Sequence, residues 1–269
     1  MSFLLYIPLW LMVPIIALLS IAIIFTGFKI IHKFIHYEHL EKYHNVTSYI
    51  FNAFGLLYAV IIAFVVYINW SDYNNAQEQV YNESNYISNL FHNVQGFPEP
   101  VKSDLMKCII EYTDHIYYVE MTDMKFGKSD YERNIYYSKL WDYFLKIEPK
   151  KLDNPLLYEQ CLGLINKISE SRRFRYFYLN NTIPSLIWVV MLFGCYFSFS
   201  FSFFFGMRAK FPYLLLVIGF TFINIILLYL IFILDHPYQG VNAISYLPME
   251  KILAHFNTCL LYTSDAADE

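Results

Sequence analysis

Four long stretches of this sequence contain no Asp, Glu, Lys or Arg: Leu4 to Phe28, Val46 to Ser71, Tyr176 to Met207 and Phe211 to Leu234. A helix needs about 20 residues to cross a hydrocarbon core of ~30 Å, and each stretch is long enough to do so. Charged residues make up only 16% of the chain, below the ~25% of soluble domains. This shortage of charge argues against the buried helices of a soluble protein and predicts four helices that span a lipid bilayer.

The polar region between the second and third stretches has no segment in which apolar and polar residues alternate as they do in a strand. Its apolar residues instead follow the 4, 3, 4, 3 spacing of one helix face, as in Leu105, Ile109, Tyr112, Ile116 and Val119. The predicted fold class is therefore all-α. We expect a polytopic membrane protein with four transmembrane helices and a helical extramembrane module between helices 2 and 3.

The domain boundaries follow from where the charge-free stretches begin and end. Residues 1–71 are predicted to contain transmembrane helices 1 and 2 (about 4–28 and 46–71), and residues 72–180 the helical module. Residues 181–240 are predicted to contain helices 3 and 4 (about 183–207 and 211–234) and an exit turn at 235–240. Residues 241–258 form a C-terminal segment. Residues 259–269, CLLYTSDAADE, match a translated sequencing adapter, so we expect them to be a non-native tail.

Motifs for catalysis or metal binding are missing. No HExxH, GxSxG or phosphate-loop pattern occurs, and the four cysteines lack metal-ligand spacing. Glu111 and His115 have the i, i+4 spacing of a metal pair, but a solvated helix face explains them better. We expect no enzyme activity, no catalytic residues, no metal site and no cofactor. A net charge of −4 also gives no basic surface for nucleic acid.

Ionisable side chains are also absent from the four predicted spans, which argues against ion-coupled transport, because such transporters bind or relay their ion with those groups. The second span instead carries Gly55, Ala59 and Ala63 at four-residue intervals, between Asn52 and Val66. Small residues at this spacing let helices approach closely in lipid. The same face would equally suit a narrow apolar pore, so both readings stay open.

Two polar junctions carry a more specific pattern. The first follows the second span and includes Trp70, Tyr73, Ala76 and Glu83. The second follows the fourth span and includes Asp235, Pro237, Tyr238 and Gly240. Together they resemble the W-x-x-Y-x-x-A…E segment and the L-D-x-P-[FY]-x-G turn of the bestrophin-like family, four-span membrane proteins distantly similar to bestrophin anion channels.

The resemblance implies a homo-oligomer whose second span lines a pore, with the helical module and both termini in the cytoplasm. It does not extend to calcium gating or anion selectivity. The sequence has neither the acidic cluster that follows the turn in animal bestrophins nor the Arg-rich stretch that follows their pore helix. An inorganic ion is therefore the expected permeant species, without a named identity.

The second junction also has a local physical meaning. Pro237 ends a helix, and Gly240 permits a tight turn. Asp235 at a helix C-terminus is electrostatically unfavourable, so we expect a compensating partner, for which Lys167 or the cluster from Arg172 to Arg175 is the candidate.

Two functions remain open from the sequence. The first is a bestrophin-like passive ion channel in which Asn52, Gly55, Ala59, Ala63 and Val66 line or support the pore. The second is a non-conducting membrane scaffold or sensor whose helical module binds a protein partner.

Overall fold

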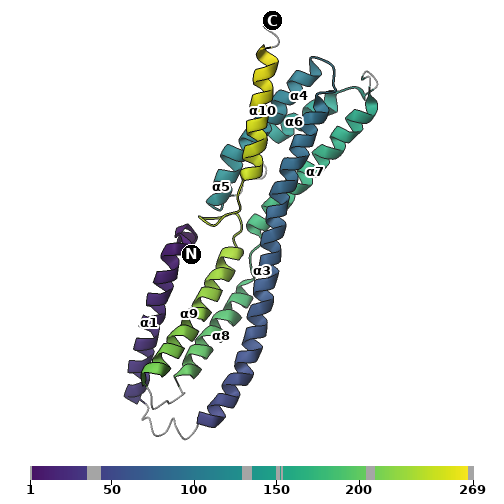
Figure 1. Ribbon diagram of the computed structural model, residues 1–269. Coiled ribbons are helices and arrows are strands. Elements are labelled where there is room, and N and C mark those ends of the chain that lie inside the picture. The colour runs from purple at the N-terminus through teal and green to yellow at the C-terminus, as the bar shows by residue number, and fades with distance from the viewer. Residues whose placement is uncertain are drawn as a thin grey trace. The chain divides into compact units, whose positions relative to one another are not determined.

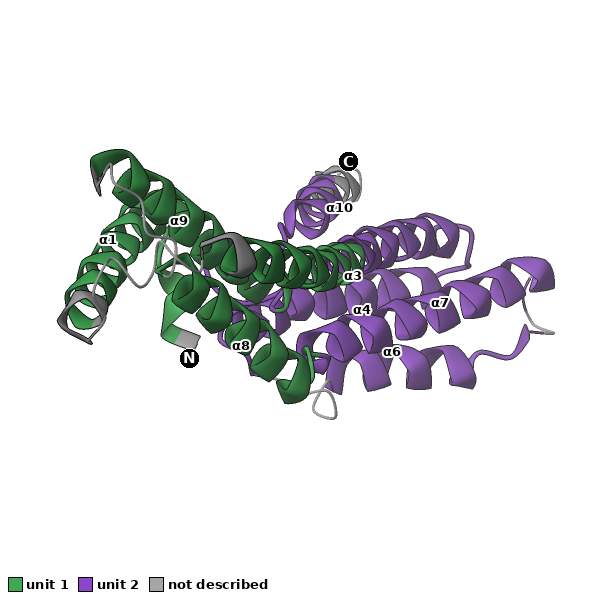
Figure 2. Ribbon diagram, turned by 90° about the horizontal axis from the view of Figure 1, so that it is seen from below, with its two compact units in different colours: residues 1–72, 182–235 green, residues 73–181, 236–269 purple. Residues whose placement is uncertain are grey.

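The computed structural model describes residues 2–34, 44–128, 135–149, 152, 154–203 and 210–265. The described chain forms two compact units (Figure 2), which are residues 1–72 with 182–235 (unit 1) and residues 73–181 with 236–269 (unit 2). The predicted end of the third span at 204–207 and the last four residues of the predicted tail lie outside the described residues.

Unit 1 contains the four helices that are long and apolar enough to cross a membrane. They are α1 (Leu9–Phe34), the first part of α3 (His44–Val94), α8 (Ser185–Ser202) and α9 (Lys210–Leu234), preceded by a short 3-10 helix at Ser2–Tyr6. Their apolar windows have a mean hydropathy between 1.7 and 2.7. Since no strand occurs in the described chain, the all-α class with four membrane-spanning helices is confirmed.

The helices of unit 1 pack through apolar stripes rather than charges. On α1, Met12 and Ile16 contact Tyr229 and Ile233 of α9. Helices α3 and α8 meet where the ring of Tyr58 lies over Gly194, and the Tyr58 hydroxyl donates a hydrogen bond to the backbone oxygen of Met191 at 3.1 Å. A glycine at position 194 is required because a Cβ there would overlap the Tyr58 ring.

Unit 2 is a helical module around one hydrophobic core (Figure 1). It consists of the remainder of α3, α4 (Val101–His115), a π-helical turn (Ile116–Glu120), α5 (Met121–Lys125), α6 (Ile135–Lys146), α7 (Pro155–Asn180) and α10 (Leu247–Asp265). Helix α7 begins with Asn154 as its N-cap, whose side chain accepts a hydrogen bond from the Leu157 N–H at 3.4 Å. Helix α10 runs through residues 259–265 of the predicted non-native tail.

The apolar stripe predicted for α4 is correct except at its last position. Leu105, Ile109, Tyr112 and Ile116 are fully buried, but Val119 is 46% exposed. The π-helical turn at Ile116–Glu120 explains the difference, because its wider turn shifts the buried face by about one residue. The carboxylate of Glu120 therefore enters the core in place of Val119.

We expect Gly194→Ala to lower the thermal stability of the purified protein by about 1–3 kcal/mol, because the added methyl group overpacks the Tyr58 contact. Gly219→Ala is the matched control, since a Cβ at Gly219 meets no atom within 4 Å. Thermal unfolding in detergent measures both variants. Equal midpoints for the two would contradict the role of Gly194 in joining α3 to α8.

Candidate functional site

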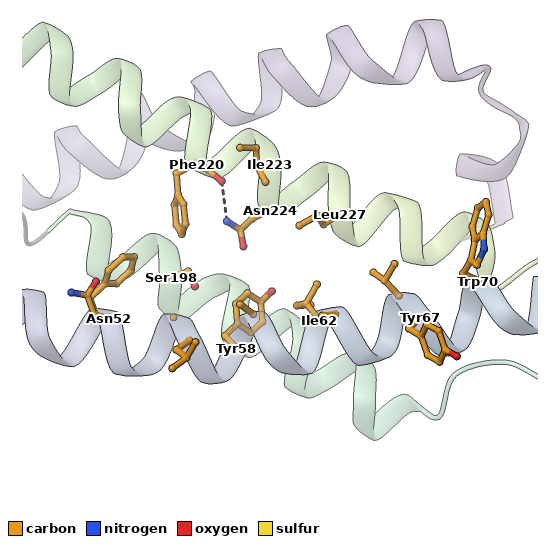
Figure 3. Close-up of a pocket in the computed structure, with 16 residues that line it drawn as sticks. Asn52, Tyr58, Ile62, Tyr67, Trp70, Ser198, Phe220, Ile223, Asn224 and Leu227 are labelled. Carbon is orange, nitrogen blue, oxygen red and sulfur yellow. Dashed lines mark hydrogen bonds between the residues drawn. The ribbon is translucent and has the colours of Figure 1, made fainter.

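A long groove in unit 1 is the candidate site, with a volume of about 930 Å³ (Figure 3). Helices α3, α8 and α9 form its walls. Its lining residues are Phe51, Asn52, Gly55, Leu56, Tyr58, Ala59, Ile62, Ala63, Val66, Tyr67, Trp70, Ser198, Phe220, Ile223, Asn224 and Leu227. From Phe51 to Trp70 the groove follows α3 for about 28 Å, close to the thickness of a hydrocarbon core.

The five positions singled out on the second span, Asn52, Gly55, Ala59, Ala63 and Val66, all line this groove. They lie on α3 at intervals of three or four residues, which places them along one side of the helix. A Cβ added at Gly55 would meet no atom within 4 Å. The small residues of this face are therefore not used to bring the helices of unit 1 together.

The groove is mostly apolar, and several of its polar side chains bond to backbone oxygens of the unit. Asn224 donates from Nδ2 to the Phe220 backbone oxygen at 2.9 Å, and the Ser198 hydroxyl donates to Gly194 at 2.8 Å. Among its lining residues, none is charged. Trp70 of the first motif lines one end of the groove and is 53% exposed.

The other motif residues, apart from Asp235, lie in unit 2. Tyr238 is completely buried, and its hydroxyl donates to the backbone oxygen of Ala76 at 2.8 Å. This bond joins the segment after α9 to the continuation of α3. Ala76 is also fully buried, and Tyr73 packs partly buried against the same core. The two motifs that the sequence suggested are thus in direct contact through Tyr238 and Ala76.

The turn after α9 has the geometry expected of a helix exit. Gly240 has a φ of 76°, which favours glycine, and its N–H donates to the backbone oxygen of Lys125 at 3.2 Å. The Pro237 oxygen accepts from the Ile244 N–H at 2.9 Å. The first bond joins the turn to the end of α5, and the second lies within the segment after α9.

Asp235 has a backbone partner that the sequence analysis did not predict. Its Oδ1 accepts a hydrogen bond of 2.7 Å from the backbone N–H of Ile183, just before α8 begins. Of the expected cluster, Arg172 bonds to Glu120 and Arg175 bonds to Glu83. A pairing of Asp235 with Lys167 or with this cluster stays a prediction. A backbone donor just before α8, the helix that precedes α9 in the chain, is thus a partner that side-chain charges in the sequence do not reveal.

Glu83 belongs to a buried ion-pair network in unit 2. Arg175 donates to it twice, from Nε at 2.8 Å and from Nη2 at 3.1 Å, and Nη2 also reaches Glu120 at 2.9 Å. Arg172 donates to Glu120 at 3.2 Å, and the Tyr112 hydroxyl donates to Glu83 at 3.2 Å. The network joins α3, α4, the π-helical turn and α7.

The protonation states follow from this geometry. Burial lowers the pKa of Arg175, but the carboxylates of Glu83 and Glu120 more than offset this, so its pKa lies well above the usual value. Burial, helped by the charge of Glu83, raises the pKa of Tyr112 well above its usual value. The guanidinium is therefore charged and the phenol neutral at physiological pH.

The sequence analysis did not identify this network, although a signal was present. Arg172 and Arg175 continue the 4, 3, 4, 3 spacing of the buried residues Cys161, Ile165 and Ile168 on α7. Charges that continue a buried stripe must be paired inside the core.

The pair Glu111 and His115 lies elsewhere, on α4. Glu111 forms an ion pair of 2.5 Å with Lys139, and the His115 ring contacts Tyr136 at a centroid distance of 4.9 Å. Within the residues that the structure describes, no three His, Cys, Asp or Glu side chains gather as a metal site would need.

We expect Glu83→Leu and Arg175→Met each to destabilise the protein by about 3–5 kcal/mol, because each leaves a buried charge without its main partner. The double variant should lose less than the sum of the two, since both charges are then gone. Thermal or denaturant unfolding of the four proteins measures this coupling. Strictly additive losses would show that the pair contributes no mutual stabilisation.

Comparison with known proteins relates these features to a family. A bestrophin-like domain matches residues 18–249. None of the curated proteins compared matches the sequence.

Solved structures share the fold. A bacterial bestrophin homologue from Klebsiella pneumoniae superposes with a TM-score of 0.70 at 11% identity, covering 90% of this chain and 96% of that one. A variant of this homologue gives a TM-score of 0.67 at 10% identity, with 91% and 97% covered. A structure described as a membrane protein gives 0.70 at 10% identity, with 91% and 96% covered. Because the domain match includes most of the chain and the fold agrees, this protein belongs to the bestrophin-like family.

Proposed function

We propose that this protein is a homo-oligomeric, passive ion channel in which the face of α3 from Asn52 to Val66 lines or supports the conduit. The observation that carries the proposal is the groove along α3, which contains all five of the expected pore positions. Bestrophin homologues with the same fold give the proposal its family context.

An oligomer gives this face of α3 a partner. Gly55, Ala59 and Ala63 would allow a helix of another subunit to approach closely, and packing of this kind drives helix association in lipid. Around Gly55 the helices of unit 1 leave this space open. The small residues are therefore available for subunit contacts or for a central axis.

The chemistry of the groove fits passive conduction. Its lining residues carry no charge, so they supply no group that would bind or relay a coupling ion. A narrow conduit with such walls opens and closes by wetting and dewetting. Leu56 and Val66 would supply the apolar surface, and Asn52 a polar group near one end.

We expect Ala59→Asn to increase ion flux through liposomes that contain the purified protein, because an amide in the conduit stabilises water inside it. Ala53→Asn is the matched control: it makes the same substitution on α3 at an exposed position outside the groove lining, and it should leave the flux unchanged. Halide and cation flux measured in parallel would identify the permeant ion.

The oligomeric state decides between conduction and packing. Increased flux from an intact oligomer supports a pore along α3, whereas loss of the oligomer in Ala59→Asn would assign this face to packing. No flux from any variant with the oligomer intact would reject the channel. The protein would then be better described as a scaffold or sensor whose helical module binds a protein partner.

We also propose that the helical module and both termini are cytoplasmic, on the basis of the family resemblance. A membrane-impermeant maleimide applied to intact cells should therefore not label Leu145→Cys, an exposed position on α6. It should label His39→Cys, which lies between the first two spans in the sequence. The reverse pattern would invert the topology.

A further inference from the structure

The turn that ends α5 carries an exposed aromatic side chain next to a glycine with positive φ. It has the sequence Lys125-Phe126-Gly127-Lys128, and the Phe126 ring is 61% exposed. Gly127 has a φ of 69°. Phe126 lies between two lysines in the sequence and is not part of the hydrophobic core of unit 2.

This turn is hydrogen-bonded to the segment that follows α9. The Gly240 N–H donates to the Lys125 oxygen at 3.2 Å, and a Cβ at Gly127 would lie 3.1 Å from Oε1 of Gln239. The Lys125 ammonium lies 5.6 Å from the ring centroid of Tyr246. In the described part of the chain, the two residues with positive φ are Gly127 and Gly240. Both belong to the place where Lys125–Lys128 meets Gly240–Val241, which we call the joint. Figure 1 shows the segment between α9 and α10 passing beside α5.

A second exposed apolar side chain lies at the same joint. Val241 follows Gly240 directly and is 56% exposed. The hydrogen bond from Gly240 to Lys125 brings the backbone of Val241 near that of Phe126. The joint thus presents two apolar side chains with Lys125 and Lys128 beside them.

The covalent chain keeps this surface near the membrane. Leu234 is the last residue of α9, a candidate span, and Gly240 follows six residues later. Six extended residues reach at most ~22 Å, so the joint cannot lie farther than that from the end of the span. Aromatic and basic side chains close to a membrane surface are typical of the headgroup region, where rings sit at the interface and lysines meet lipid phosphates.

We propose that the joint formed by Lys125–Lys128 and Gly240–Val241 is a membrane-interface anchor that inserts Phe126 and Val241 among the headgroups of anionic lipids. The lysines supply the charge complementarity, and the two glycines fix the turn before it meets the membrane. The anchor would hold the end of α5 and the exit segment of α9 at the same membrane surface. It does not depend on whether the protein conducts ions.

The test places a fluorophore at the turn of the full-length protein. Phe126→Cys is made together with Cys259→Ser, and the native Cys108, Cys161 and Cys195 are buried, which favours selective labelling. The matched control is Leu145→Cys, which is 60% exposed on α6. Leu145 is far from the turn under test. Its neighbour Phe144 contacts Phe97, which lies just beyond the end of α3 at Val94. Ala76, which bonds to Tyr238, lies about 27 Å from Val94 along α3.

Each labelled protein is reconstituted into neutral phosphatidylcholine vesicles and into vesicles that also contain phosphatidylglycerol. Lipids that carry a nitroxide in the headgroup region serve as quenchers. We expect the label at position 126 to be blue-shifted and quenched, more strongly with the anionic lipid, while the label at position 145 behaves as in water. Lys128→Glu should remove the increase caused by the anionic lipid.

Three outcomes would overturn the proposal. Equal, water-like emission at positions 126 and 145 would show that the turn does not meet the membrane. A blue shift without quenching by the lipid nitroxide would show that protein covers the turn. Equal quenching in neutral and anionic vesicles would reject the preference for anionic headgroups.

Discussion

The buried guanidinium of Arg175 is the constraint on which the helical module depends. A charge removed from water is tolerated only when good hydrogen bonds compensate its desolvation, and Arg175 obtains them from Glu83 and Glu120. These three groups come from α7, the continuation of α3 and the π-helical turn, so each of these elements must keep its register for the network to form. The wide turn at Ile116–Glu120 is what brings Glu120 inward, and a regular helix would have presented Val119.

The turn that follows α9 is held in place by hydrogen bonds within unit 2. A chain that leaves a membrane-spanning helix must change direction within a few residues, and the polar groups of the turn need hydrogen-bond partners. Here the Tyr238 hydroxyl bonds to the Ala76 oxygen, and Gly240 adopts a left-handed conformation that lets its N–H reach Lys125. The two motifs that led to the family are therefore connected by structural contacts, and most of their residues support the fold rather than line the groove.

The helices of unit 1 associate for different reasons than those of unit 2. Lipid offers no water to solvate a charge, and it provides no hydrophobic force that drives apolar helices together. The helices of unit 1 meet through shape, as where Tyr58 lies over Gly194, and polar side chains such as Tyr58 and Asn224 bond to backbone oxygens. The small residues Gly55, Ala59 and Ala63 remain at the groove, and this availability connects the fold of the unit to the proposed conduit.

The sequence by itself determined the four spans, the all-helical class and the family, because charge-free length, helical periodicity and short motifs are local properties. It also placed the small residues of α3 on one side, since a helix converts spacing directly into direction. Only the tertiary structure decided that Glu83 pairs with Arg175, residues far apart in the sequence, and that Asp235 bonds to a backbone N–H. Such pairings depend on which helices become neighbours and on one wide turn that shifts the register, and neither can be read from spacing within a single helix.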